Sequence, residues 1–226
     1  MLGSRRWGGS IAAWLAERCG QTGHVLVTDI DPRFLVESAS LDHPSLEIQR
    51  HDIGTDPLPA QPFDVIHARL VLSHVPAREV ALERMVTTLK PGGWLIVEDF
   101  DATLIDPGYP TSDAQALALY RNMLAAQGRL MTARSGELAL TWGRSLYRRL
   151  RALGLVNLGM EGYVAVWQGK STGARLVGAN FEQIREEAAG AGLITNEEIA
   201  QVLTLLDDPD FAFSAPVMFT AWGRRP

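Results

Sequence analysis

The feature that most constrains this fold is the regular alternation of short apolar runs and amphipathic segments between residues 11 and 100. The runs at residues 24–29, 46–51, 63–68 and 94–99 are typical of strands, and the stretches 11–19, 32–39 and 76–89 fit helices. Strict alternation of strands and helices predicts a parallel sheet with helices on both faces. We therefore expect an α/β fold with a doubly wound, mostly parallel sheet.

The second half of the chain has a different pattern. Helices are expected over residues 111–128, 135–153 and 173–191. Thr195-Asn-Glu-Glu198 has the form of a capping box, which opens a further helix to about Leu206. Alternating apolar residues predict strands at 156–167 and 216–223. We expect a single domain over residues 1–226, in which residues 1–102 form one half, 103–153 and 168–208 are helical insertions, and the two late strands close the sheet.

Composition narrows the class of protein. The 226 residues carry 21 basic and 26 acidic side chains, a net charge of −5, and the basic residues are scattered, which does not favour nucleic acid as a partner. The local cluster from Arg144 to Arg151 follows helical spacing and is expected to be a solvated face. No apolar run reaches the ~18 residues of a membrane helix, and no secretory signal pattern is expected. The single Cys19 is expected to be a buried structural thiol, which fits a cytoplasmic setting.

Five motifs stand in a fixed order. They are Gly8-Gly9-Ser10 before a helix, Val27-Thr-Asp-Ile-Asp31, His51-Asp-Ile53, Phe63-Asp-Val-Ile-His-Ala-Arg69, and Leu89-Lys-Pro-Gly-Gly-Trp-Leu95. In this order and spacing the chain resembles the class I S-adenosylmethionine-dependent methyltransferases. The resemblance covers residues 8–100 well and the closing strands more loosely. It implies a Rossmann-like fold, S-adenosyl-L-methionine as cofactor, and methyl transfer to a small molecule.

The resemblance also assigns roles to individual residues. Asp29 corresponds to the carboxylate that accepts hydrogen bonds from both ribose hydroxyls, and Ile30 to the residue against the adenine ring. Asp52 corresponds to the acceptor for the adenine amino group, with the Ile53 backbone beside it; a turn or cap role for Asp52 stays open. Gly8 and Gly9 correspond to the end of the cofactor loop. Asp31 is better explained as the N-cap before Pro32 than as a ligand.

His67 is the candidate catalytic residue. It lies near the carboxyl end of a strand, where open parallel sheets bind their ligands, and histidine is a suitable general base near neutral pH. A packing role for His67 is the alternative, and His74 is a weaker candidate. Glu98, Asp99 and Asp101 follow the next strand, but clustered loop carboxylates are usually solvated, and we expect no metal site.

The two helical segments, 103–153 and 168–208, are expected to form a substrate lid. Their aromatic and apolar residues suit an apolar small molecule, with core packing as the alternative for most of them: Tyr109, Tyr120, Met123, Met131, Trp142 and Trp167. The sequence does not indicate the methyl acceptor atom or the oligomeric state.

The N-terminus departs from the family. Aligned on Gly9-Ser10, the motif Glu-x-Gly-x-Gly-x-Gly places Gly3 at the acidic position and Arg5 and Trp7 at two glycine positions, where the backbone must approach the cofactor. The first strand is thus expected to be largely missing. A frame slip near the start of the coding sequence is one hypothesis for this departure. A catalytically impaired remnant or binding protein is the alternative function, and a nicotinamide-dependent dehydrogenase fits less well.

Overall fold

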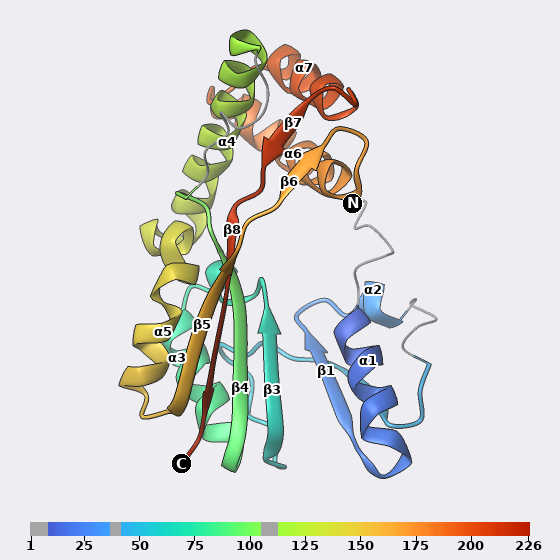
Figure 1. Ribbon diagram of the computed structural model, residues 1–226, viewed down its shortest axis with the longest axis vertical. Coiled ribbons are helices and arrows are strands. Elements are labelled where there is room, and N and C mark those ends of the chain that lie inside the picture. Colours follow the sequence, from blue (N-terminus) through green and yellow to red (C-terminus); the bar gives the residue numbers. More distant parts are fainter. Residues whose placement is uncertain (1–8, 37–41, 105–112) are drawn as a thin grey trace. The chain divides into compact units, whose positions relative to one another are not determined.

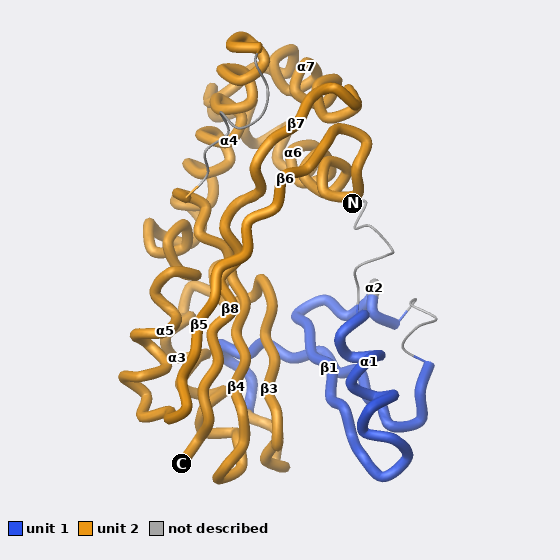
Figure 2. The backbone as a smooth tube through the Cα atoms, in the orientation of Figure 1, with its two compact units in different colours: residues 1–57 blue, residues 58–226 orange. Residues whose placement is uncertain are grey.

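The computed structural model describes residues 9–36, 42–104 and 113–226. Contacts divide the chain into two compact units, residues 1–57 and residues 58–226 (Figure 2). The expectation of one domain over residues 1–226 remains a prediction. The expected loss of the first strand concerns residues before Gly9, which lie outside the described residues.

The first unit contains a parallel pair of strands. Val25 is paired with Leu46 and Asp29 with Arg50, so both strands end at the same edge. This pairing agrees with the alternation of strand and helix in the sequence. The elements are α1 (Ser10–Cys19), the 3-10 turn η1 (Gly20–Thr22), β1 (Val25–Asp29), α2 (Arg33–Val36) and β2 (Leu46–Arg50).

Helix α1 buries a small side chain and leaves a large one exposed. Ala16 is fully buried, whereas Trp14 is 51% exposed and lies under the Arg18 guanidinium, 4.7 Å from the ring centroid. Cys19, the last residue of the helix, is exposed, so the expectation of a buried thiol is wrong. We attribute the burial of Ala16 to its small side chain, which lets α1 pack closely against β1 and β2.

The second unit is built on a mixed sheet of four strands in the order β3-β4-β8-β5 (Figure 1). β3 and β4 are parallel, whereas β8 runs antiparallel to both of its neighbours, β4 and β5. The strand expected over residues 156–167 ends at Tyr163 in this sheet, because residues 166–168 form a separate strand that pairs with residues 212–214. The bounds of the four strands are β3 (Phe63–Arg69), β4 (Leu89–Asp101), β5 (Val156–Tyr163) and β8 (Val217–Arg224).

The Lys-Pro-Gly-Gly motif is part of β4 and is not a separate turn. The β3–β4 register shifts between Phe63 and Val65, so the motif forms an irregularity inside one long strand. Gly92 has φ +81, and a Cβ on Gly93 would lie 3.0 Å from the Phe63 carbonyl oxygen, so both positions require glycine. Arg224 Nε donates to the Gly92 carbonyl at 2.8 Å, which fixes the irregularity to the end of β8.

Helices α3 (Arg78–Thr88) and α5 (Trp142–Ala152) pack against the sheet of this unit. Burial alternates along β4, where Leu95, Val97, Asp99 and Asp101 are buried on the face that α5 covers. Trp142 is buried at the start of α5, with Arg149 4.1 Å and Arg78 5.7 Å from its ring centroid.

The expectation of a wholly solvated arginine face on α5 is therefore wrong for Arg149. Its side chain is only 13% exposed and pairs with Glu79. A guanidinium stacks readily on an indole ring, and this contact keeps the arginine beside Trp142.

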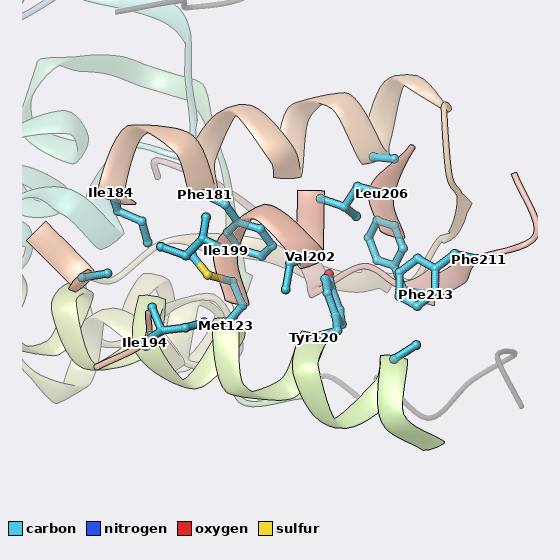
Figure 3. Packing of buried hydrophobic residues seen from close by; sticks show 14 of the residues in the cluster. Tyr120, Met123, Phe181, Ile184, Ile194, Ile199, Val202, Leu206, Phe211 and Phe213 are labelled. Atoms are coloured by element: carbon cyan, nitrogen blue, oxygen red, sulfur yellow. The ribbon is translucent and has the colours of Figure 1, made fainter. Parts of the chain in front are cut away.

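A hydrophobic core that includes no residue of the four-stranded sheet is drawn in Figure 3. It is formed by α4, α6 and α7 together with Phe211 and Phe213, and the Tyr120 and Phe213 ring centroids are 5.0 Å apart. We call this part the lid. Its elements are α4 (Ala114–Ser135), β6 (Val166–Gln168), α6 (Thr172–Gly190), α7 (Asn196–Leu206) and β7 (Ala212–Ser214).

The helix boundaries in the first expected insertion differ from those in the structure. α4 continues to Ser135 and ends at Gly136, which has φ +77; the 3-10 segment η4 (Glu137–Thr141) follows, and α5 then turns onto the sheet. The capping box at Thr195 is present as expected, because Thr195 Oγ1 accepts from the Glu198 N–H at 3.1 Å and Glu198 accepts from the Thr195 N–H at 2.9 Å. Glycine thus ends α4, and the capping box begins α7.

Candidate functional site

The first unit gathers the predicted cofactor residues at one edge. β1 and β2 are parallel, so their carboxyl ends bring Asp29 and the segment after Arg50 together. The His51 N–H donates to the Asp29 carbonyl at 2.9 Å and continues this pairing beyond β2. Asp29 consequently lies at the same end of the strand pair as the loops that carry Ile30, Asp52 and Ile53. This is the edge that binds ligands in open α/β sheets.

Asp29 is an exposed carboxylate at the tip of β1. Its Oδ1 accepts from the Asp31 N–H at 2.8 Å, which fixes the side chain, and no hydrogen bond to Oδ2 occurs among the described residues. Ile30 is 62% exposed beside it. An acceptor next to an exposed apolar side chain can bind a sugar hydroxyl and an aromatic ring at the same time.

Asp52 organises the loop after β2. Its Oδ1 accepts from the Gly54 N–H at 2.8 Å, and its own N–H donates to Asp56 Oδ2 at 2.9 Å. This is an Asx-type turn, so the turn role left open by the sequence is present. The acceptor role of Asp52 toward an adenine, and that of the Ile53 backbone, remain predictions.

Gly9 begins α1 in a left-handed conformation, with φ 81 and ψ 7. Its carbonyl accepts from the Ala13 N–H at 2.8 Å, and the helix start has no side-chain cap within the described part of the chain. The N–H groups of a first helical turn suit an anionic ligand group. Gly8 lies outside the described residues.

The Asp31 side chain accepts hydrogen bonds from Arg33, the first residue of α2. Its Oδ1 accepts from the Arg33 N–H at 3.5 Å and from Arg33 Nε at 2.7 Å. The hydrogen bond from the Arg33 side chain lowers the pKa of Asp31 below its ordinary value. This agrees with the expectation that Asp31 caps the segment after Pro32.

In the second unit, His67 pairs with a carboxylate on the neighbouring strand. Its Nε2 lies 2.8 Å from Glu98 Oε2, and both side chains are only 18% exposed. Glu98 Oε1 accepts from Thr220 Oγ1 at 3.0 Å. The three residues come from β3, β4 and β8 and share one face of the sheet.

The three acidic residues near the end of β4 do not form one cluster. Glu98 faces His67, whereas Asp99 and Asp101 are fully buried on the opposite face, so the expectation of a solvated cluster is wrong for them. Alternation along the strand separates their side chains. Among the described residues, no group of three or more His, Cys, Asp or Glu side chains is placed to hold a metal ion.

The buried aspartates stabilise local structure. Asp99 Oδ2 accepts from the Ser73 N–H at 3.0 Å, and burial raises the pKa of Asp99 despite this bond. Burial also acts to raise the pKa of Asp101, but hydrogen bonds from Arg144 and Thr103 outweigh it and lower that pKa. His74 lies in the 3-10 turn η3 (Leu72–His74). It is close enough to Asp99 for a charge on the histidine to oppose the rise in the pKa of Asp99.

Several residues suggested as substrate contacts are core residues. Tyr120 and Met123 are buried in the lid, and Trp142 is buried beside the sheet. Trp167 packs against the lid core. Tyr109 lies outside the described residues. Core packing, the alternative that the sequence left open, is therefore what the structure shows for these four.

The sequence did not indicate Glu98 and Thr220 as partners of His67. Their meeting depends on the register of β3 on β4 and of β8 on β4. One signal was present in the sequence, because side chains along a strand alternate between the two faces of the sheet. Glu98 and Trp94 therefore point to one face of β4, and Asp99 and Leu95 to the other.

The solved structure of BH2331 from Bacillus halodurans C-125, named as a methyltransferase candidate, shares this fold. The TM-score is 0.59 at 15% identity, over 97% of this chain and 89% of that one. The architecture thus defines an α/β methyltransferase-like fold with a mixed sheet.

The sequence comparisons give the family. Residues 6–97 match the family described as "Methyltransferase domain". The UbiE protein of Vibrio campbellii, a ubiquinone/menaquinone biosynthesis C-methyltransferase, is 31% identical over 120 residues, or 51% of this chain and 46% of that protein. Methyltransferase str2 of Strobilurus tenacellus is 49% identical over 45 residues, 20% of this chain and 16% of that protein. Residues 6–97 are thus similar to the methyltransferase domain of S-adenosylmethionine-dependent methyltransferases.

The matches cover only part of these relatives. The chain spans about half the length of UbiE and less of str2. Within the described ranges, no helix has the length and apolarity that a membrane span requires.

Proposed function

We propose that this protein binds S-adenosyl-L-methionine and transfers its methyl group to an apolar small molecule. The observation that carries the proposal is the edge of the first unit, where the Asp29 carboxylate and the Ile30 side chain are exposed side by side within the segment that matches the family. The relatives named as C-methyltransferases of quinone biosynthesis support an apolar acceptor.

The residues present fit the nucleoside end of this cofactor. Asp29 would accept from the ribose hydroxyls, Ile30 would lie against the adenine, and Asp52 with the Ile53 backbone would bind its polar edge. Gly8 and Gly9, before the uncapped first turn of α1, would lie along the amino-acid part. When bound, the cofactor supplies a methyl group on a positively charged sulfur, and the C–S bond electrons stay on sulfur as the acceptor bonds to the methyl carbon.

The candidate catalytic residue lies in the second unit. His67 is proposed as the base that takes a proton from the acceptor. The lid is proposed to cover the substrate at the end of the sheet where β3 and β4 finish. α5 packs on the sheet, so the covering role falls to α4, α6 and α7.

Titration calorimetry with S-adenosylhomocysteine tests the proposal. Wild-type protein is expected to bind saturably, and Asp29→Ala to weaken binding at least tenfold, because a hydrogen bond to a charged group is worth about 1.5–3 kcal/mol. Asp31→Ala is the matched control, since this neighbouring carboxylate is occupied by Arg33 and its loss is expected to change Kd less than about threefold.

Two results would count against methyl transfer. No binding at millimolar S-adenosylhomocysteine would favour the remnant or binding protein over the enzyme. Equal losses in Asp29→Ala and Asp31→Ala would overturn the assignment of the ribose contact to Asp29.

A further inference from the structure

We infer that Glu98 is a positioning residue, which holds His67 in the tautomer that carries its proton on Nε2 and leaves Nδ1 to accept a proton. This inference rests on the proposed function, because it deepens the role of His67 in the same site. Its basis is the 2.8 Å contact between His67 Nε2 and Glu98 Oε2. An ionised carboxylate can only accept, so the nitrogen that faces it must carry the hydrogen.

Glu98 is itself held in place. Thr220 Oγ1 donates to its second oxygen at 3.0 Å, so both carboxylate oxygens are occupied by side chains from the two flanking strands. Glu98 lies opposite Thr220 in the antiparallel β4–β8 register and opposite Arg69 in the parallel β3–β4 register. Arg69 Nε lies 3.9 Å from Oε2, so a guanidinium also faces this carboxylate.

The backbone next to this group is strained. Leu70, immediately after β3, has φ 55, a conformation that costs a non-glycine residue roughly 1–2 kcal/mol. The Leu70 N–H donates to the Glu98 carbonyl at 2.8 Å and so ties the turn to Glu98. Strain of this kind clusters at functional sites, where a fixed geometry matters more than local stability.

The arrangement defines a proton path. A proton released by the acceptor during methyl transfer would pass to the lone pair on Nδ1, and the proton on Nε2 would remain in its bond to Glu98. The imidazolium that forms would be stabilised by the Glu98 carboxylate at 2.8 Å. No hydrogen bond to Nδ1 of His67 occurs among the described residues, so this nitrogen is available.

The test is ¹⁵N NMR of the histidine ring nitrogens at mildly alkaline pH, where imidazole is neutral. The His67 signals are assigned by their loss in His67→Gln. In wild type, we expect Nε2 to show the shift of a protonated nitrogen and Nδ1 that of an unprotonated one. If Nδ1 shows the shift of a protonated nitrogen in wild type, the inference is overturned.

Glu98→Gln gives the sharper result. Thr220 donates toward Oε1, so it should hold the amide oxygen there and turn the amide NH₂ toward His67 Nε2. The proton is then expected to move to Nδ1. The double variant Glu98→Gln with Thr220→Val should lose this bias and show a mixture of tautomers. An unchanged tautomer in Glu98→Gln would overturn the inference.

The two proposals fail separately. S-adenosylhomocysteine binding tests the cofactor site in the first unit, whereas the ring-nitrogen shifts report only on β3, β4 and β8. Binding that persists without a tautomer change in Glu98→Gln would refute the role of Glu98 alone. A tautomer change without cofactor binding would support the geometry around His67 and refute methyl transfer.

Discussion

Gly143, the second residue of α5, lies where the helix touches the backbone of β4. A Cβ at this position would be 2.4 Å from the Asp99 carbonyl oxygen and 2.8 Å from that of Phe100. Both neighbours are backbone atoms of a strand that is hydrogen-bonded on each side. Gly143→Ala must therefore move the helix away from the sheet.

The expected change follows from two opposing terms. Replacing glycine by alanine in a helix stabilises it by roughly 0.5–1 kcal/mol. Overpacking a close contact costs about 1–3 kcal/mol, and a contact with strand backbone belongs in the upper half of this range. We expect Gly143→Ala to lower the free energy of unfolding by about 1–2 kcal/mol, the opposite of its effect in an exposed helix.

Gly178 provides the matched control. It lies inside α6, and a Cβ there would be 3.5 Å from Leu203 Cδ2, which is ordinary van der Waals contact. Gly178→Ala is expected to stabilise the protein by about 0.5–1 kcal/mol.

Urea unfolding followed by circular dichroism measures both variants. With a slope of roughly 3 kcal/mol per molar, Gly143→Ala should lower the midpoint by about 0.5 M and Gly178→Ala should raise it. A Gly143→Ala midpoint equal to or above that of wild type would refute the close approach of α5 to β4.

Two further predictions concern the lid and the buried acid. Phe181 is fully buried in the lid core, so Phe181→Ala should cost about 3–5 kcal/mol, and hydrogen exchange should show the loss in α4, α6 and α7 before β3 and β4. Equal loss in both regions would contradict a separate lid core. Burial raises the pKa of Asp99 above its ordinary value of 3.8, so the folded state keeps a proton that the unfolded chain releases, and stability falls as the pH rises from 3.8 through the raised pKa. Asp99→Asn should remove this decline in unfolding experiments across pH; an unchanged pH profile would show that Asp99 is not its source.

Strands and helices whose formation depends on residues close in the sequence could be predicted. The strand that ends at Asp29 has a continuous apolar run, and the helix after Thr195 has a capping box whose two hydrogen bonds lie within four residues. Such signals depend on neighbours in the chain, and so the sequence contains them. The grouping of Asp29 with Asp52 also follows, because parallel strands end at one edge.

Features that depend on contacts between distant segments could not be predicted. Thr220 lies 122 positions from Glu98, and only strand register brings them together. The burial along α1 is a second example, because the strands accept the small Ala16 side chain and leave the larger Trp14 exposed. Both results are decided by tertiary packing, which local periodicity does not describe.

The separate core of the lid has a consequence for how such a protein can change. Tyr120, Phe181 and Phe213 stabilise the lid among themselves, whereas Leu95 and Val97 are buried at the sheet. Mutations can therefore accumulate on the lid surface without weakening the strands that carry His67 and Glu98. Under the proposed function, this separation would let the preference for an acceptor change while His67 and Glu98 keep their places.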